Sequence, residues 1–317
     1  MSKPIEVCIL TGYLGAGKTT LLNHLLCSLK HRNVFVIENE LGELPIDGAF
    51  IQHKQTQMIE LTHGCICCTL DSELEDTLWE IVQNKSDVDL LLIEATGTAD
   101  SGSIGALFMQ PAIRKHFDLL SCVCVVDAES FEHRLQHTDE TGKQLAFATD
   151  VVINKTEFVT LEYADQLSNI IRKINPFAEI SQTAYGSVST SDLLHPKIRN
   201  NQFSKPDHTH SHTHDVEAIP YTTTQRCDMD ELNYCLRSLL FLYNHQIYRV
   251  KGIVRGQDNH MYLVQSAGKH ITMTKLSEWG NTPQETRLVV IGNGITEKTI
   301  RRLLRKPFAQ KGLKADP

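Results

Sequence analysis

The chain has 317 residues, which exceeds what one hydrophobic core usually organises, so two domains are expected. Its composition, 41% hydrophobic and 22% charged residues, is that of a globular protein and excludes overall disorder, collagen-like repeats and coiled coil. The net charge of −7 repels a phosphate polymer, which argues against nucleic acid as a partner.

The nine cysteines are an odd number spread unevenly along the chain, unlike the disulfide framework of a secreted protein. No apolar run approaches the roughly 18 residues that a membrane span needs, and the first residues do not have the pattern of a signal peptide. We therefore expect a cytoplasmic protein without a membrane partner.

Short apolar runs alternate with helical patterns over residues 1–195. The expected strands are residues 7–10, 34–37, 90–93, 122–126 and 151–153, and the expected helices are residues 19–29, 71–82 and 161–174. Apolar runs separated by helices are typical of buried parallel strands. The predicted fold class of this first domain is α/β with a mainly parallel sheet.

The remaining residues divide into a linker and a second domain. Residues 196–220 are polar, contain three prolines and show no periodicity, which predicts a His-rich linker. After it, helices are expected at residues 228–243 and 296–305, and strands at residues 246–254, 261–265, 270–274 and 288–291. Residues 221–317 are therefore predicted to form a smaller α+β C-terminal domain.

A phosphate-binding motif lies between the first expected strand and the first expected helix. Residues 12–19 fit the pattern G-x-x-x-x-G-K-[ST], which makes the first domain a P-loop NTPase domain. Glycines let backbone N–H groups turn toward phosphate oxygens, while Lys18 reaches the β and γ phosphates and the Thr19 hydroxyl binds Mg²⁺. A glycine-rich turn with an incidental lysine is the alternative. The candidate phosphate-binding residues are Gly12, Gly15, Ala16, Gly17, Lys18, Thr19 and Thr20.

An acidic residue and a glycine follow the expected strand 90–93. Glu94 stands at the carboxyl end of this strand, where it can position Mg²⁺ or the attacking water. Gly97 allows a close backbone approach, so that its N–H can reach the γ phosphate. With Lys18 and Thr19, these two residues form the predicted catalytic set. The alternative for Glu94 is a strand-end carboxylate that caps the next helix.

The strand 151–153 is followed by a segment that is close to the N-K-x-D signature for guanine. Asn154 and Lys155 match it, and Glu157 replaces the expected aspartate. The longer side chain still offers two acceptor oxygens but moves them by about a bond length, so guanine is favoured over adenine without strict selectivity. Residues 183–186 either close over the base or form an ordinary turn.

Three cysteines in four residues, Cys65, Cys67 and Cys68, make the most unusual segment of the chain. Structural zinc sites prefer pairs of cysteines from two loops, so this cluster lacks a fourth ligand of its own. An incomplete set of soft ligands suits Zn²⁺, Co²⁺ or Ni²⁺ held for transfer. A redox-active thiol cluster and small buried side chains are the alternatives.

Two further segments carry potential metal ligands. Glu38 and Glu43 belong to an acidic loop after strand 34–37, which is either a source of carboxylate ligands or a solvated turn. Four histidines alternate with other residues in the expected linker, where they either capture a metal ion weakly or belong to a flexible segment. These histidines are His208, His210, His212 and His214.

The order and spacing of these motifs resemble the CobW-type P-loop GTPases, which are regarded as metal chaperones or insertases. The similarity includes the P-loop, residues 38–40, 64–68, 94–97 and 154–157, and it continues through residues 248–252, 264–268 and 288–292. The resemblance implies that Asn154 and Glu157 read the base and that the three clustered cysteines bind metal. It also strengthens Glu38 and Glu43 as ligands, but it does not identify the metal.

The sequence therefore predicts a GTPase that uses GTP and Mg²⁺ and binds a transition metal, Zn²⁺ or alternatively Co²⁺ or Ni²⁺. Its nucleotide state is expected to control metal transfer to an unidentified client metalloprotein. A metal- or nucleotide-dependent homo-oligomer is left open. One rival is a P-loop ATPase or kinase with incidental cysteines. The other is a metal-storage protein that nucleotide merely stabilises.

Overall fold

The computed structural model describes residues 3–38, 56–60, 70–84, 87–194, 216–279 and 284–308; for residues 56–60 and 70–72 only the backbone is described. The chain forms two compact units that divide near residue 200. We call them the first and the second unit and describe each by itself.

The first unit contains a seven-stranded sheet in the order β3-β2-β4-β1-β5-β6-β7, in which every described pairing is parallel. Its strands are β1 (Ile5–Thr11), β2 (Val34–Glu38), β3 (Thr56–Glu60), β4 (Leu90–Glu94), β5 (Phe117–Asp127), β6 (Asp150–Asn154) and β7 (Glu179–Gln182). All residues of β2, β4 and β6 are buried, because helices cover both faces of a parallel sheet.

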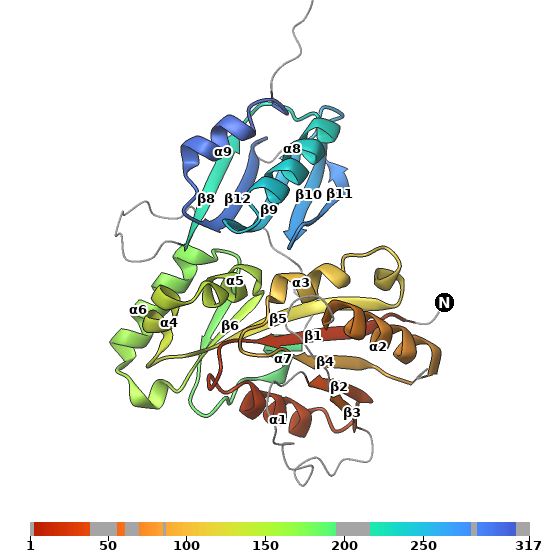
Figure 1. Ribbon diagram of the computed structural model, residues 1–317, viewed down its shortest axis with the longest axis vertical. Helices are drawn as coiled ribbons and strands as arrows, with labels where there is room; N and C mark the ends of the chain where they lie inside the picture. Colours follow the sequence, from red (N-terminus) through yellow and green to blue (C-terminus); the bar gives the residue numbers. More distant parts are fainter. Residues whose placement is uncertain are drawn as a thin grey trace, which may run out of the picture. The chain divides into compact units, whose positions relative to one another are not determined.

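Helices lie on both sides of this sheet (Figure 1). The helices are α1 (Lys18–Ser28), α2 (Leu70–Asn84), α3 (Ser101–Leu107), α4 (Phe131–His137), α5 (Asp139–Phe147), α6 (Leu161–Ile174) and α7 (Thr190–Leu194), with 3-10 turns at Ile113–Lys115 and Thr156–Phe158. The leucines of α1 and α7 pack against alternate residues of β1, β2, β4 and β5. Figure 1 shows α2, α3 and α5 on the opposite side, where α3 contacts both neighbours.

The second unit contains a five-stranded antiparallel sheet in the order β11-β10-β9-β12-β8 and two helices. It consists of β8 (Val216–Thr223), α8 (Met229–Leu242), β9 (Ile247–Arg255), β10 (His260–Ala267), β11 (His270–Glu278), β12 (Thr286–Asn293) and α9 (Glu297–Leu303). Leucines of α8 and Ile300 of α9 share one apolar core with the sheet. The fold class predicted from the sequence is confirmed.

Some elements differ from those expected. Strand β8 begins at Val216, so residues 216–220 are strand and not the end of a linker. Pro220 hid this strand from a reading of the sequence, yet proline is tolerated here because β8 lies at the edge of its sheet. Helices α4 and α5 were also missed, because each is shorter than the window over which helical periodicity shows.

Candidate functional site

The phosphate loop connects β1 to α1, and at three of its positions it has a backbone conformation that residues other than glycine rarely adopt. Gly12, Gly15 and Gly17 have φ angles of 134°, 78° and 103°. A Cβ at Gly12 would collide with the carbonyl of Val125 in β5, and one at Gly17 would collide with the side-chain amide of Asn154. The loop therefore fits tightly between two neighbouring strands at the carboxyl edge of the sheet.

Lys18 is folded back over this loop. Its Nζ donates hydrogen bonds to the carbonyl oxygens of Gly12 (2.9 Å) and Tyr13 (3.3 Å), and the residue is only 7% exposed. A cation held against carbonyl oxygens of the loop lies within reach of any phosphate that the loop cradles.

Thr19 and Glu94 meet although they are 75 residues apart. The Thr19 hydroxyl donates to the Glu94 carboxylate at 3.0 Å, from the first turn of α1 to the end of β4. Glu94 is 5% exposed. A hydroxyl oxygen and a carboxylate are hard oxygen donors of the kind that Mg²⁺ prefers, so the pair fits this ion. Helix α3 is capped by Asp100, whose carboxylate accepts from Gly102 N, and not by Glu94.

Gly97 lies directly against the phosphate loop. The residue is buried, and a Cβ there would be 2.5 Å from the backbone nitrogen of Leu14. Its carbonyl oxygen accepts a hydrogen bond from the side chain of Gln144. The structure thus brings the four predicted catalytic residues together around one loop.

Asn154 connects three segments of the candidate nucleotide site. Its Nδ2 donates to the carbonyl of Ala16 (3.0 Å), and its Oδ1 accepts from the backbone N–H of Gly186 (2.8 Å). The side chain is 3% exposed, so it holds the loops and does not face solvent. Residues 183–186 therefore lie beside the phosphate loop, and exposed Thr20 borders Gly186.

The residues after Asn154 point in different directions. Lys155 adopts a left-handed conformation with φ of 62°, and its Nζ pairs with the Asp127 carboxylate at 2.8 Å. Glu157 lies exposed in the following 3-10 turn. Guanine recognition by Glu157 remains a prediction.

The predicted metal ligands are only partly within the described structure. Glu38 ends β2 with 8% exposure and is the register partner of Glu94 on β4. Cys65, Cys67, Cys68, Glu43, His208, His210, His212 and His214 lie outside the described residues. Within the described part, no three His, Cys, Asp or Glu side chains are grouped so as to hold a metal ion.

Two of the remaining cysteines are poor metal ligands. Burial raises the pKa of the Cys8 thiol and of the Cys124 thiol to about 12. Thiolate is the metal-binding form, so these side chains stay protonated and act as small core residues.

Two side chains outside the predicted motifs contact the phosphate-binding segments. The Arg134 guanidinium of α4 lies 4.2 Å from the centroid of the Tyr13 ring in the phosphate loop. Gln144 of α5 bonds to the segment after β4. Neither residue belongs to a local sequence motif. Their contacts with the loops depend on how α4 and α5 pack, so the sequence pattern did not predict them.

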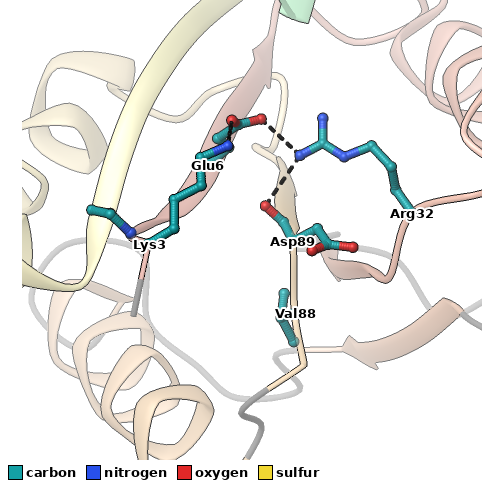
Figure 2. A pocket seen from close by; sticks show the side chains of 6 residues that line it. Lys3, Glu6, Arg32, Val88 and Asp89 are labelled. Atoms are coloured by element: carbon teal, nitrogen blue, oxygen red, sulfur yellow. Dashed lines mark hydrogen bonds and ion pairs between the residues drawn. The ribbon is translucent and has the colours of Figure 1, made fainter. Parts of the chain in front are cut away.

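A charged depression of about 380 Å³ lies at the amino end of β1, away from the phosphate loop (Figure 2). There the guanidinium of Arg32 points toward Glu6 (2.7 Å) and the carbonyl of Asp89 (3.2 Å), while Lys3 also pairs with Glu6. Burial alone would raise the pKa of Glu6, but the two cations together lower it. These charges neutralise one another. They lie at the amino ends of the strands, whereas the phosphate loop follows the carboxyl end of β1.

Comparison with known proteins agrees with this geometry. Residues 6–182 match the CobW/HypB/UreG nucleotide-binding domain, and residues 216–307 match the C-terminal domain of the cobalamin synthesis protein cobW. The chain is 30% identical over 311 residues to a protein named zinc chaperone YjiA from Escherichia coli, covering 94% of this chain and 97% of that one. It is 26% identical to a Schizosaccharomyces pombe protein named zinc-regulated GTPase metalloprotein activator 1, over 87% and 78% of the two chains.

Among solved structures, Zn(II)-bound YjiA GTPase from E. coli superposes with a TM-score of 0.77 at 24% identity, over 96% of this chain and 99% of that chain. This likeness shows a common fold. Fold and site together define a P-loop nucleotide-binding protein. The chain belongs to the CobW/HypB/UreG family, because the family match includes more than half of its residues and the cobW C-terminal match accounts for most of the remainder. The family expected from the motifs is confirmed.

Proposed function

We propose that this protein hydrolyses GTP and uses its nucleotide state to control the transfer of Zn²⁺ to a client metalloprotein. The names of the relatives, zinc chaperone and zinc-regulated GTPase metalloprotein activator, support the proposal. The observation that carries it is the register pairing of Glu38 with Glu94, which links a proposed metal ligand to the nucleotide site through neighbouring strands.

In this proposal the phosphate loop binds GTP through the backbone N–H groups of residues 12–20. When GTP binds, the Lys18 ammonium leaves the loop carbonyls and donates to phosphate oxygens instead. This places its positive charge near the bond that breaks. The base lies near Asn154, Lys155 and Glu157, with residues 183–186 beside it. Asn154 acts mainly by holding the loops, and Glu157 supplies the acceptor oxygens for guanine.

Hydrolysis requires water to attack the γ phosphorus while the bond to the β–γ bridging oxygen breaks, which gives GDP and inorganic phosphate. Thr19 and Glu94 would hold Mg²⁺, which supplies positive charge to the phosphate oxygens when bound. Gly97 offers its backbone N–H to the γ phosphate. Hydrolysis without a client should be slow, since none of the residues assigned above to phosphate or Mg²⁺ is an arginine.

The zinc site is proposed to combine Cys65, Cys67 and Cys68 with Glu38 or Glu43. Glu38 and Glu94 are register partners on adjacent strands, which lie about 4.8 Å apart. A change at the γ phosphate that moves Glu94 therefore reaches Glu38 through one strand pairing. Loss of one ligand from a tetrahedral set weakens zinc binding, so the nucleotide state can set metal affinity.

The test measures Zn²⁺ affinity by competition with a chromophoric chelator, with a non-hydrolysable GTP analogue, with GDP and without nucleotide. We expect affinities that differ at least fivefold between the GTP and GDP states. Identical affinities in all three states would rule out the coupling. Nucleotide competition with ATP in the same assay distinguishes a GTPase from an ATPase or kinase.

Two variants separate the role of the cysteine metal site from that of the nucleotide site. A Cys65, Cys67 and Cys68 triple alanine variant should lose the nucleotide-sensitive site, and Co²⁺ and Ni²⁺ titrations of this variant report what the histidine run binds by itself. Lys18→Ala should retain zinc binding but lose GTP-dependent transfer to an acceptor chelator. Unchanged transfer by Lys18→Ala would favour metal storage instead.

We propose the class of client and the compartment as well. A metalloprotein that receives Zn²⁺ is the expected partner, and the second unit, about a third of the chain, is proposed to face it. Among the described residues no helix is long and apolar enough to cross a membrane. A cytoplasmic location remains our proposal.

A further inference from the structure

A buried side-chain amide on α5 contacts the segment between β4 and α3. Gln144 is 1% exposed, and its Nε2 donates to the carbonyl oxygens of Gly97 (3.0 Å) and Ala99 (3.3 Å). A buried amide that loses its partners costs about 1–3 kcal/mol, so this contact holds its position firmly.

Helix α5 is a rigid support for this contact. It packs on α3 so closely that a Cβ at Gly105 would collide with the ring of Phe147. Phe147 lies one helical turn after Gln144 on α5, and Gly105 lies on the helix that follows the contacted segment. The glutamine therefore lies on a helix that packs closely against α3, the helix into which the contacted segment leads.

The segment of residues 95–100, which we call the Gly97 loop, contains a turn in which the Ala99 N–H donates to the carbonyl of Thr96 (3.1 Å), and it is also held at its ends. The Ala95 N–H donates to the carbonyl of Leu10 (2.9 Å), and the Asp100 side chain caps α3. Between these two points the Gly97 backbone lies against Leu14 of the phosphate loop. The two bonds from Gln144 hold the middle of the loop in that place.

We infer that Gln144 is a positioning residue that fixes Gly97 for contact with the γ phosphate and thereby sets the preference for GTP over GDP. The inference rests on the proposed function. Because the Gly97 N–H meets an oxygen that only GTP possesses, fixing the Gly97 loop stabilises the GTP complex and leaves the GDP complex unaffected. The Gln144 side chain does not touch the nucleotide in this role.

The first variant is Gln144→Leu, which keeps the size of the side chain and removes the amide donor. We expect the ratio of GTP-analogue affinity to GDP affinity to fall about tenfold, with GDP affinity within twofold of wild type. The kcat of GTP hydrolysis should fall with it. Gln182→Leu is the control for the loss of two side-chain bonds in the first unit, since the exposed Gln182 donates to Asp165 (2.9 Å) and Ser168 (3.1 Å).

A second variant tests the donor directly and does not depend on the leucine variant folding. In Gln144→Glu a protonated carboxyl can donate one bond to Gly97, whereas the ionised form cannot and repels the carbonyls. Burial raises the pKa of a carboxyl, so the donating form should become populated as the pH is lowered from 8 to 6. The ratio of GTP-analogue affinity to GDP affinity, relative to that of wild type, should rise over the same range.

The outcomes separate the two proposals. A wild-type protein that neither hydrolyses GTP nor prefers it would overturn the proposed function. An active wild type with an unchanged or increased GTP preference in Gln144→Leu, or a pH-independent Gln144→Glu variant, would overturn only the role of Gln144.

Discussion

Removal of the Asn154 side chain should damage both stability and nucleotide binding. The amide joins Ala16 of the phosphate loop to Gly186 of the segment after β7, and both bonds are buried. Asn154→Ala leaves a carbonyl oxygen and an N–H without a partner away from water. Each unsatisfied group costs about 1–3 kcal/mol, so we expect a loss of about 2–6 kcal/mol.

This loss is large beside the roughly 5–15 kcal/mol that stabilises a domain. Even the lower value, about 2 kcal/mol, corresponds to roughly a 30-fold change in an equilibrium constant. If the bonds hold the loops in the conformation that binds nucleotide, GDP affinity should fall by a factor of that order. Asn154→Asp keeps the acceptor for Gly186 but turns a carboxylate toward the Ala16 carbonyl, so it should also weaken binding.

The assay must report on the first unit alone. The chain has two tryptophans, and in a Trp279→Phe background only Trp79 of α2 remains. Denaturant unfolding followed by Trp79 fluorescence then measures the free energy of unfolding of that unit, and a fluorescent GDP analogue measures affinity. Ser28→Ala is the control in the same unit, because the Ser28 hydroxyl makes an exposed bond to the carbonyl of His24 within α1.

The control should change stability by less than about 0.5 kcal/mol. The reasoning would be refuted if Asn154→Ala lost as little as this control and bound GDP within twofold of wild type. Such a result would mean that Ala16 and Gly186 find other partners or water once the amide is removed.

Three further predictions concern the described core and the phosphate loop. Burial raises the pKa of the Cys8 and Cys124 thiols to about 12 from the ordinary 9.0, so both should resist alkylation at pH 8 in the folded protein, and rapid labelling would contradict their burial. Their contribution to stability should be complete below pH 9 and should decline as the pH rises toward 12. Gly105→Ala should destabilise the first unit by about 1–3 kcal/mol through a collision with Phe147, and Phe147→Leu in the same chain should restore part of that loss in a denaturant titration; full stability of the single variant would contradict the close packing. Arg134→Ala should lower GTP and GDP affinity alike, two- to fivefold by fluorescence titration, since the stacked guanidinium supports the phosphate loop by about 0.5–1 kcal/mol; an effect on GTP alone would show contact with the γ phosphate instead.

The local elements of the nucleotide site were predictable because they depend on neighbouring residues. The phosphate loop needs glycines where φ is positive, and the sequence places them at Gly12, Gly15 and Gly17 between an apolar strand and a leucine-rich helix. Fully buried strands such as β4 and β6 appear as continuous apolar runs because both faces of a parallel sheet are covered. Glu94 and Asn154 then follow at strand ends, where the carboxyl edge gathers them.

The role of individual side chains was less accessible. Asn154 matched a base-reading signature, yet it is a buried connector whose partner Ala16 lies 138 residues away in the chain. Gln144 belongs to no motif and reaches Gly97 across 47 residues. Strand β8 was hidden by Pro220 and by the polar residues before it, and only its pairing with β12 makes it a strand.

The sequence by itself determined the family, the phosphate loop and the positions of the candidate catalytic residues, because these follow from covalent neighbours and from the period of burial. The tertiary structure decided which side chains hold those residues in place. Contacts such as Thr19 with Glu94 and Gln144 with Gly97 join segments that are distant in the chain. They exist only because strand order and helix packing bring the carboxyl edge of the sheet and α5 to the same loops, and no local pattern records that packing.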